Sequence, residues 1–221
     1  MPGYVEIHLD AVFATGPGTA VDCSSTFPSI TSERAIRLKF AGMKKLSLEE
    51  LDRISIDEYR EASKTPVCIV LDNVRSLHNV GSAFRTADAF RLEKIWLTGI
   101  TGIPPHREIE KTALGATSSV PWEYIENPFD AVSRLKEKGY TIVAVEQTTE
   151  SVALDRFIPL PEARYCLVFG NEVHGVSTEV VDACDVALEI PQSGTKHSLN
   201  ISVCLGIVVW DIHQKRQAHY R

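Results

Sequence analysis

The sequence lacks a long uncharged run, and this absence excludes a membrane-spanning helix. The longest uncharged helical stretch in the 221 residues runs from Ser198 to Trp210, which is shorter than the roughly 20 residues needed to cross a bilayer. The first Lys or Arg is Arg34, so the N-terminus has neither the basic start of a signal peptide nor the Arg-rich pattern of a transit peptide. We therefore expect a cytoplasmic protein without a membrane partner.

Positive charge is also scarce. The chain has 23 Lys and Arg residues against 29 Asp and Glu residues, which gives a net charge of -6. This balance does not by itself indicate a nucleic-acid partner. A local basic patch would still suffice, because binding depends on where the charges are placed.

Several motifs that carry chemistry are absent. The cysteines are odd in number and have no metal-type spacing (Cys23, Cys68, Cys166, Cys184, Cys204), so we expect reduced thiols and no metal site. No GxGxxG or GK[ST] motif is present, which argues against a dinucleotide fingerprint and a P-loop. No GxSxG or HExxH motif occurs either, so hydrolase functions have no support.

Predicted strands and helices alternate along most of the chain. Short apolar runs bounded by turn residues predict strands at 67–72, 94–98, 120–125, 140–146, 165–169 and 186–190. Segments between and after them predict helices at 79–90, 108–114, 128–138, 177–183 and 201–212. This alternation predicts an α/β fold with a mostly parallel sheet and helices on both faces.

Residues 1–64 are predicted to form a separate N-terminal extension with a short helical arm, followed by one domain at 65–221. Residues 15–31 are rich in Gly, Pro, Ser and Thr, which is typical of loops. Dense charges of both signs follow, and they predict helices at 32–42 and 47–62. The second helix would begin with a capping box formed by Ser47 and Glu50.

The predicted helix at 201–212 is apolar on two sides. Its two stripes consist of Leu199, Val203, Ile207 and Trp210, and of Ile201, Leu205, Val208 and Ile212. A single sheet covers only one stripe, so the other needs a further partner, which is either the short and mostly charged N-terminal arm or a second chain. A second copy related by a two-fold axis is the commonest solution, and we therefore expect a homodimer.

Three polar clusters follow the C-terminal ends of predicted strands. They cover 72–85 (DNVRSLHNVGSAFR), 169–176 (FGNEVHGV) and 190–200 (IPQSGTKHSLN). In the first, Asn79 is suited to cap a helix, Gly81 admits a ligand or a second chain segment, and Arg85 either pairs with Asp88 or binds a ligand. The carboxyl ends of parallel strands share one edge of a sheet, so the clusters are expected to meet there.

The order and spacing of these clusters resemble the SpoU/TrmH class of SPOUT RNA 2′-O-ribose methyltransferases. NVRSLHNVGSAFRTADAF is similar to the first family motif, LVFGNEVHGVS to the second and IPQSGTKHSLNISVCLGIVVW to the third, over about Pro66 to Trp210. The resemblance implies a C-terminal trefoil knot, S-adenosyl-L-methionine as cofactor, and methylation of a ribose 2′-hydroxyl in tRNA or rRNA. It also implies pairing of two chains, but it does not identify the RNA or the nucleotide.

The resemblance further assigns roles to individual residues. It implies that Asn79 and Arg85 act at the RNA, that Glu172 holds the site together, and that Ser198 and Asn200 complete it. The implied cofactor-binding residues are Val145, Glu146, Gln147, Gly170, Asn171, Ile190, Pro191 and Leu199. Arg85 is either the base or a charged phosphate ligand, since lowering an arginine pKa from above ~12 to ~7 needs roughly 7 kcal/mol.

Two other functions are alternatives to RNA ribose methylation. A non-catalytic RNA-binding relative would share the fold, although such a protein need not keep all five of the implied catalytic residues. A nucleotide-dependent enzyme such as a dehydrogenase is disfavoured by the missing GxGxxG motif. Basic residues of the arm either contact the RNA backbone or form a solvated helix face (Arg34, Arg37, Lys39, Lys44, Lys45).

Overall fold

The structure of the protein is a computed structural model that describes residues 44–47 and 49–218. The chain divides into two units, residues 1–53 and 54–221. The helix predicted at 32–42 lies outside the described residues, as do Arg34, Arg37 and Lys39. Lys44 and Lys45 are described and exposed.

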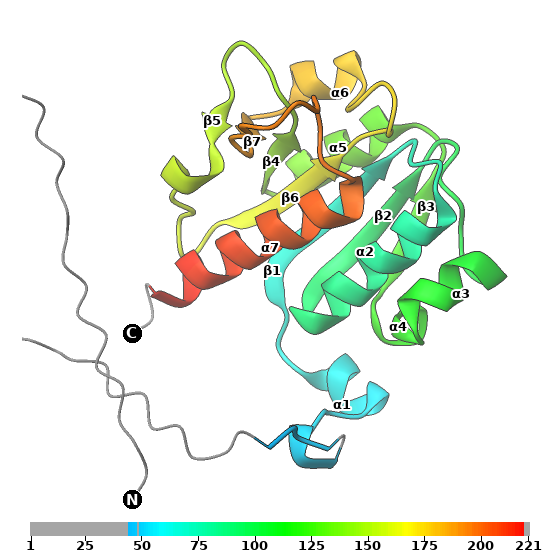
Figure 1. The fold of residues 1–221 in the computed structure, drawn as a ribbon. Helices are drawn as coiled ribbons and strands as arrows, with labels where there is room; N and C mark the ends of the chain where they lie inside the picture. The colour runs from blue at the N-terminus through cyan, green and yellow to red at the C-terminus, as the bar shows by residue number, and fades with distance from the viewer. Residues whose placement is uncertain (1–43, 48, 219–221) are drawn as a thin grey trace, which may run out of the picture. The chain divides into compact units, whose positions relative to one another are not determined.

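The second unit alternates strands with helices (Figure 1). Its strands are β1 (Thr65–Asp72), β2 (Leu92–Thr98), β3 (Trp122–Ile125), β4 (Tyr140–Val145), β5 (Val152–Ala153), β6 (Arg164–Phe169) and β7 (Val186–Glu189). Its helices are α1 (Ile56–Glu61), α2 (Leu77–Ala89), α3 (Arg107–Ala113), α4 (Ala116–Ser119), α5 (Pro128–Glu137), α6 (Thr178–Ala183) and α7 (Ile201–Ala218), with a short 3₁₀ turn η2 (Leu154–Arg156). The predicted elements of this region are confirmed, whereas α4, β5 and η2 were not predicted.

The prediction of one continuous helix at 47–62 is wrong. Ser47 and Glu50 do exchange the two hydrogen bonds of a capping box, at 2.7 and 3.3 Å. That turn continues only as the 3₁₀ turn η1 (Glu49–Leu51), and Asp52 then adopts a φ of 46°. A second capping box, formed by Ser55 and Glu58, begins α1 at Ile56. Two start signals therefore compete in this stretch, and the later one sets the helix.

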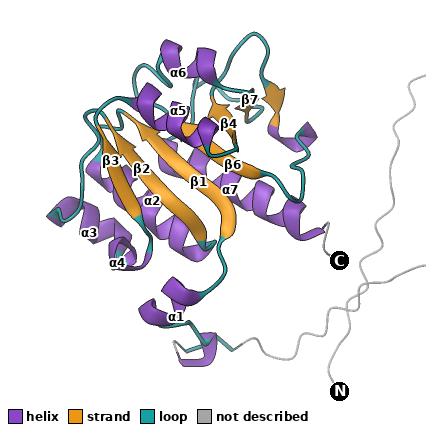
Figure 2. Cartoon of the chain, turned by 180° about the vertical axis from the view of Figure 1, so that it is seen from behind, coloured by secondary structure: helices purple, strands orange, loops and turns teal. Residues whose placement is uncertain are grey.

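The sheet has seven strands in the order β3-β2-β1-β6-β4-β7-β5, and every neighbouring pair is parallel. Side chains alternate between its two faces. On β1, Val67, Ile69 and Leu71 belong to the core beneath α2, α3 and α7, while Cys68 and Val70 belong to the core beneath α5 and α6. Figure 2 shows the sheet from behind, with α5 and α6 on the near side. The predicted helices on both faces are confirmed, and burial on both faces explains the continuous apolar runs.

Gly81 has a packing role in the first turn of α2. A Cβ atom there would lie 2.1 Å from Thr112 Oγ1 and 2.2 Å from the backbone oxygen of Ile109. Both atoms belong to α3. The close approach at Gly81 is therefore made by a second chain segment, which was one of the two alternatives from the sequence.

Gly81→Ala is expected to lower the free energy of unfolding by roughly 1–3 kcal/mol, the usual range for overpacking. Alanine is the better helix former by about 1 kcal/mol, so a net loss isolates the packing effect. Chemical denaturation measures it, with Gly194→Ala as control because no atom lies within 4 Å of the Cβ added there. A Gly81→Ala protein as stable as the wild type would contradict this account of the α2–α3 contact.

Two kinds of feature are absent from the described residues, a membrane-spanning helix and a metal-binding cluster. No helix in that part of the chain is long and apolar enough to span a membrane. No group of three or more His, Cys, Asp or Glu residues there is arranged to hold a metal ion.

Candidate active site

The three polar clusters meet at one edge of the sheet. The first follows β1 and the second follows β6, and these two strands are direct neighbours although Leu71 and its partner Phe169 are 98 residues apart. β4 lies on the other side of β6, and β7, which leads into the third cluster, lies beside β4. Chain segments that are distant in sequence therefore form one site at the carboxyl ends of adjacent strands, as predicted.

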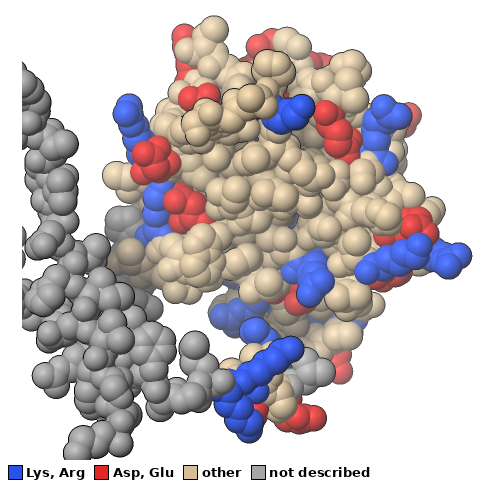
Figure 3. Space-filling view, viewed as in Figure 1, with Lys and Arg blue, Asp and Glu red and all other residues tan. Residues whose placement is uncertain are grey.

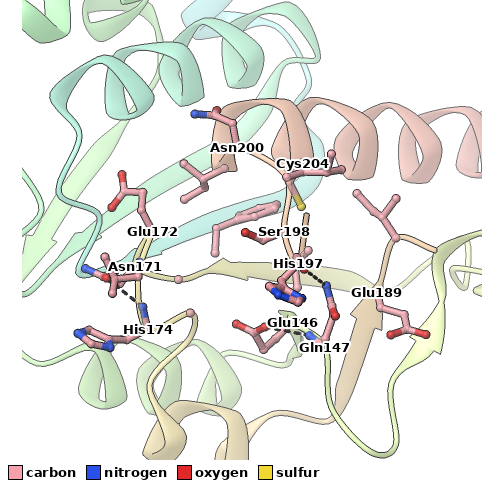
Figure 4. A pocket seen from close by; sticks show the side chains of 18 of the residues that line it. Glu146, Gln147, Asn171, Glu172, His174, Glu189, His197, Ser198, Asn200 and Cys204 are labelled. Atoms are coloured by element: carbon pink, nitrogen blue, oxygen red, sulfur yellow. Dashed lines mark hydrogen bonds between the residues drawn. The ribbon is translucent and has the colours of Figure 1, made fainter. Parts of the chain in front are cut away.

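A cavity of about 500 Å³ lies between the second and third clusters and the end of β4 (Figure 4). This volume is in the ordinary range for a small-molecule site. Ten of the thirteen implied site residues line it: Val145, Glu146, Gln147, Gly170, Asn171, Glu172, Ile190, Ser198, Leu199 and Asn200. Asn79, Arg85 and Pro191 are not among the lining residues.

Glu172 connects the second cluster to the first. Its carboxylate accepts hydrogen bonds from the backbone N–H groups of Arg75 and Ser76, both at 3.0 Å, and from Asn79 Nδ2 at 2.9 Å. Partial burial raises the pKa of Glu172, but the hydrogen bonds outweigh burial and hold that pKa below its ordinary value. The carboxylate therefore stays ionised and joins two loops that lie more than 90 residues apart.

Asn79 extends this connection to the third cluster. Its Oδ1 accepts a hydrogen bond from Asn200 Nδ2 at 3.3 Å. The expectation that Asn79 caps a helix is wrong, because Ser76 is the N-cap of α2 and its hydroxyl accepts from Asn79 N at 3.3 Å. The side chain of Asn79 is thereby free to link Glu172 with Asn200. Asn200 precedes α7, and its Oδ1 accepts from Ser202 N at 2.9 Å.

The loop of the second cluster is held by its own backbone. Asn171 and Gly175 exchange hydrogen bonds of 2.8 and 2.9 Å. A Cβ atom on Gly170 would lie 2.0 Å from Gly175 C and from Val176 N. The resemblance implies a cofactor contact at Gly170, whereas the atoms closest to the added Cβ belong to the same loop. Any side chain at Gly170 would therefore open the loop as well as disturb the cavity.

Two residues at the end of β1 hold this loop in place by hydrogen bonds. Asp72 is fully buried, and its Oδ2 accepts from both the backbone N–H and the hydroxyl of Ser177 at 2.8 Å. The backbone oxygen of Asn73 accepts from Asn171 Nδ2 at 2.7 Å. Sequence reasoning did not identify this support, because the pairing of Asp72 with Ser177 appears only once β1 and β6 are adjacent.

A hydrogen bond connects the third cluster to the segment that follows β4. Gln147 Nε2 donates to the backbone oxygen of His197 at 2.8 Å, as the dashed line in Figure 4 shows. Gln147 therefore lines the cavity and also contacts the 192–200 loop directly.

Arg85 lies outside the cavity wall. It is exposed on α2, and no ion pair with Asp88 is found in the part of the chain that the structure describes. Asp88 instead accepts from the Ser119 hydroxyl at 2.5 Å. The alternative that Arg85 forms an ion pair with Asp88 is therefore wrong for the single chain. The guanidinium of Arg85 remains accessible to a ligand.

Several lining residues have no role among those that the resemblance implies. They include Val173, His174, Glu189, Gln192 and Cys204. Helical periodicity offers a signal for Cys204, because it lies one turn after Asn200 and therefore on the same side of α7. Val173, His174 and Gln192 lie inside the second and third clusters, and Glu189 lies directly before the third.

Acidification is expected to weaken the Glu172 connection. Because the pKa of Glu172 is lowered in the folded chain, its stabilising contribution is complete above the ordinary carboxyl range and is lost as the pH falls through the lowered value. The melting temperature of wild type should exceed that of Glu172→Gln at neutral pH, and the gap should close in acid. Glu137→Gln, an exposed change on α5, serves as control. A gap that does not vary with pH would contradict the role of the carboxylate charge.

Known proteins are similar to this chain over most of its length. The model of the SpoU rRNA methylase family matches residues 66–210. A 23S rRNA (guanosine-2′-O-)-methyltransferase, RlmB, of Neisseria meningitidis is 29% identical over 160 residues, which cover 72% of this chain and 63% of the relative. The chain thus spans less than two thirds of the length of such curated relatives.

Solved structures show the same fold. The TrmH/SpoU tRNA modifying enzyme of A. aeolicus superposes with a TM-score of 0.66 at 28% identity, covering 75% of this chain and 84% of that one. An AdoMet-bound rRNA methyltransferase from Sinorhizobium meliloti gives a TM-score of 0.63 at 26% identity, covering 71% and 59%. Together with the family match over most of the chain, these similarities establish that the protein belongs to the SpoU rRNA methylase family.

Proposed function

We propose that this protein transfers the methyl group of S-adenosyl-L-methionine to a ribose 2′-hydroxyl of tRNA or rRNA. The observation that carries the proposal is the hydrogen-bonded chain Glu172–Asn79–Asn200, which joins all three family motifs beside one cavity. Family membership and the names of the relatives support the same activity.

The residues around the cavity fit this cofactor. Ile190 and Leu199 offer apolar surface for an adenine ring, and the exposed backbone of the 192–200 loop offers polar groups. Glu146 and Glu172 provide negative charge for a cationic ligand. Once bound, the cofactor supplies an electrophilic methyl group, so the protein has to position the hydroxyl and assist loss of its proton.

The chain's own residues divide this work. Hydrogen bonds to Glu172 hold Asn79 and the start of α2 against the second cluster. They thereby fix the position of α2, on which Arg85 lies. Arg85 is exposed among the described residues, so its guanidinium lies in contact with solvent there. We therefore assign it the charged role, in which its planar guanidinium binds an RNA phosphate in a bidentate manner. Proton loss then proceeds to a phosphate oxygen or water.

A second copy of the chain is the proposed protein partner. Val203, Ile207 and Trp210 on α7 are 50%, 39% and 54% exposed, while the opposite stripe is buried against the sheet. Figure 3, in the view in which α7 and α2 face the reader, shows a broad surface without charged residues across the middle of the second unit. We also retain the C-terminal trefoil knot as a proposal, on the strength of the family fold.

Labelled cofactor tests the activity directly. The protein is incubated with methyl-labelled S-adenosyl-L-methionine and separate pools of total tRNA and rRNA, and the labelled nucleotide is mapped. We expect label on a ribose 2′-oxygen in one pool. RNA binding without any transfer would instead favour a non-catalytic RNA-binding relative.

A further inference from the structure

Charge around the cavity is negative and uncompensated. Three carboxylates line it, those of Glu146, Glu172 and Glu189, and the lining contains no Lys or Arg. Glu172 is occupied in joining the loops. Glu146 directly follows β4, and backbone N–H groups hold its carboxylate in the cavity wall.

The backbone around Glu146 holds its two oxygens in place. Oε2 accepts from Val176 N and Oε1 accepts from Gln147 N, both at 2.9 Å. Gly175 leaves the necessary room, since a Cβ atom there would lie 2.1 Å from Oε2. The donors are neutral, and no ion pair to Glu146 occurs among the described residues. The carboxylate is thus rigidly placed, while its full charge remains available to a ligand.

The negative charge of Glu146 acts on another wall of the cavity. Cys204 lies on α7, the helix that follows the 192–200 loop, and it lines the same cavity as Glu146. Burial raises the pKa of Cys204 to about 11, and the nearby charge of Glu146 contributes to the increase. A ligand in this space is therefore exposed to a negative potential, which is weakly screened in a partly buried site.

Methyl transfer changes the charge at one atom of the cofactor. The bond between sulfur and the methyl carbon breaks as the bond between the methyl carbon and the ribose oxygen forms, and the hydroxyl proton leaves to solvent. Sulfur keeps the electron pair, so the positive sulfonium of the substrate becomes the neutral thioether of S-adenosylhomocysteine. The two molecules otherwise carry the same adenosine and amino-acid groups, which leaves charge as the main basis for telling them apart.

We infer that Glu146 is a specificity-determining residue that makes the cavity prefer the cationic cofactor over its neutral product. This inference rests on the proposed function, because it assumes that the cofactor binds in this cavity. A carboxylate held by backbone donors attracts the sulfonium form and gains nothing from the thioether. It therefore favours capture of the cofactor and release of the product after transfer.

Calorimetry with the full chain tests this role, using S-adenosyl-L-methionine and S-adenosylhomocysteine as separate ligands. Glu146→Gln is expected to lower the ratio of the two affinities by about tenfold, which corresponds to roughly 1.4 kcal/mol, mainly by weakening the cationic ligand. Glu146→Asp, which keeps the charge, should restore part of the ratio. Asn171→Ala is the matched control for loop disturbance, because Asn171 Oδ1 accepts from Val173 N at 2.9 Å and carries no charge. It should weaken both ligands by the same factor.

Different outcomes would overturn the role of Glu146 and the proposed function. Equal weakening of both ligands by Glu146→Gln would reduce Glu146 to a support of the loop and overturn the inference. An unchanged ratio with unchanged affinities would overturn it as well. If the wild-type chain bound neither ligand, the proposed function itself would fail, before any variant is compared.

Discussion

Arg85→Ala is expected to lower the rate of methyl transfer by about 100-fold or more, the scale seen when a substrate is no longer held in position. Affinity for S-adenosyl-L-methionine should change little, because Arg85 does not line the cavity. The physical reason is the loss of a phosphate ligand that α2 presents at a fixed position beside the site. Single-turnover transfer to the RNA identified by mapping measures the rate, and calorimetry measures cofactor binding.

Arg85→Lys distinguishes charge from shape. Lysine keeps the positive charge but lacks the planar fork that binds phosphate through two parallel hydrogen bonds, so this variant should also be defective. Arg134→Ala is the control, since Arg134 is an exposed arginine on α5, on the other face of the sheet. An Arg85→Lys enzyme with nearly wild-type activity would show that charge alone matters at this position.

Val203→Glu is expected to convert a homodimer into a monomer. Light scattering of the wild-type chain at micromolar concentration should give about twice the chain mass of 24.5 kDa, and the variant should give a single chain mass. The reason is that a carboxylate at the centre of an apolar two-fold contact would be desolvated without a partner. Methyl transfer should fall together with the mass if pairing is needed to hold the RNA.

The structure also shows which apolar stripe of α7 should carry the substitution that tests dimer formation. Val208 and Ile212 are 0% and 1% exposed against their own sheet, so glutamate there would damage the fold and would not report on an interface. Leu114→Glu is the matched control, because Leu114 is an exposed leucine (65%) beyond the end of α3. A stable and fully active wild-type monomer would show that the exposed stripe does not need a second chain.

The sequence by itself determined the elements and the motifs. Apolar runs such as 67–72 and 165–169 are long enough, and bounded clearly enough, to predict buried parallel strands. The three polar clusters follow strands and therefore had to meet at one edge of the sheet. Ten of the thirteen implied site residues line the cavity for this reason, since sequence position relative to a strand end already determines most of the placement.

Only the tertiary structure decided how these parts contact one another. Asn79 joins Glu172 to Asn200, although its local pattern predicted a cap, because the hydrogen-bond partners of its side chain come from segments 93 and 121 residues away. Gly81 and Gly170 are required by backbone that arrives from α3 and from the 171–176 loop. The two stripes of α7 are equally apolar in the sequence, and packing on the sheet determines which one is buried. Local sequence encodes periodicity and turn chemistry, whereas these contacts depend on strand order, which brings distant segments together.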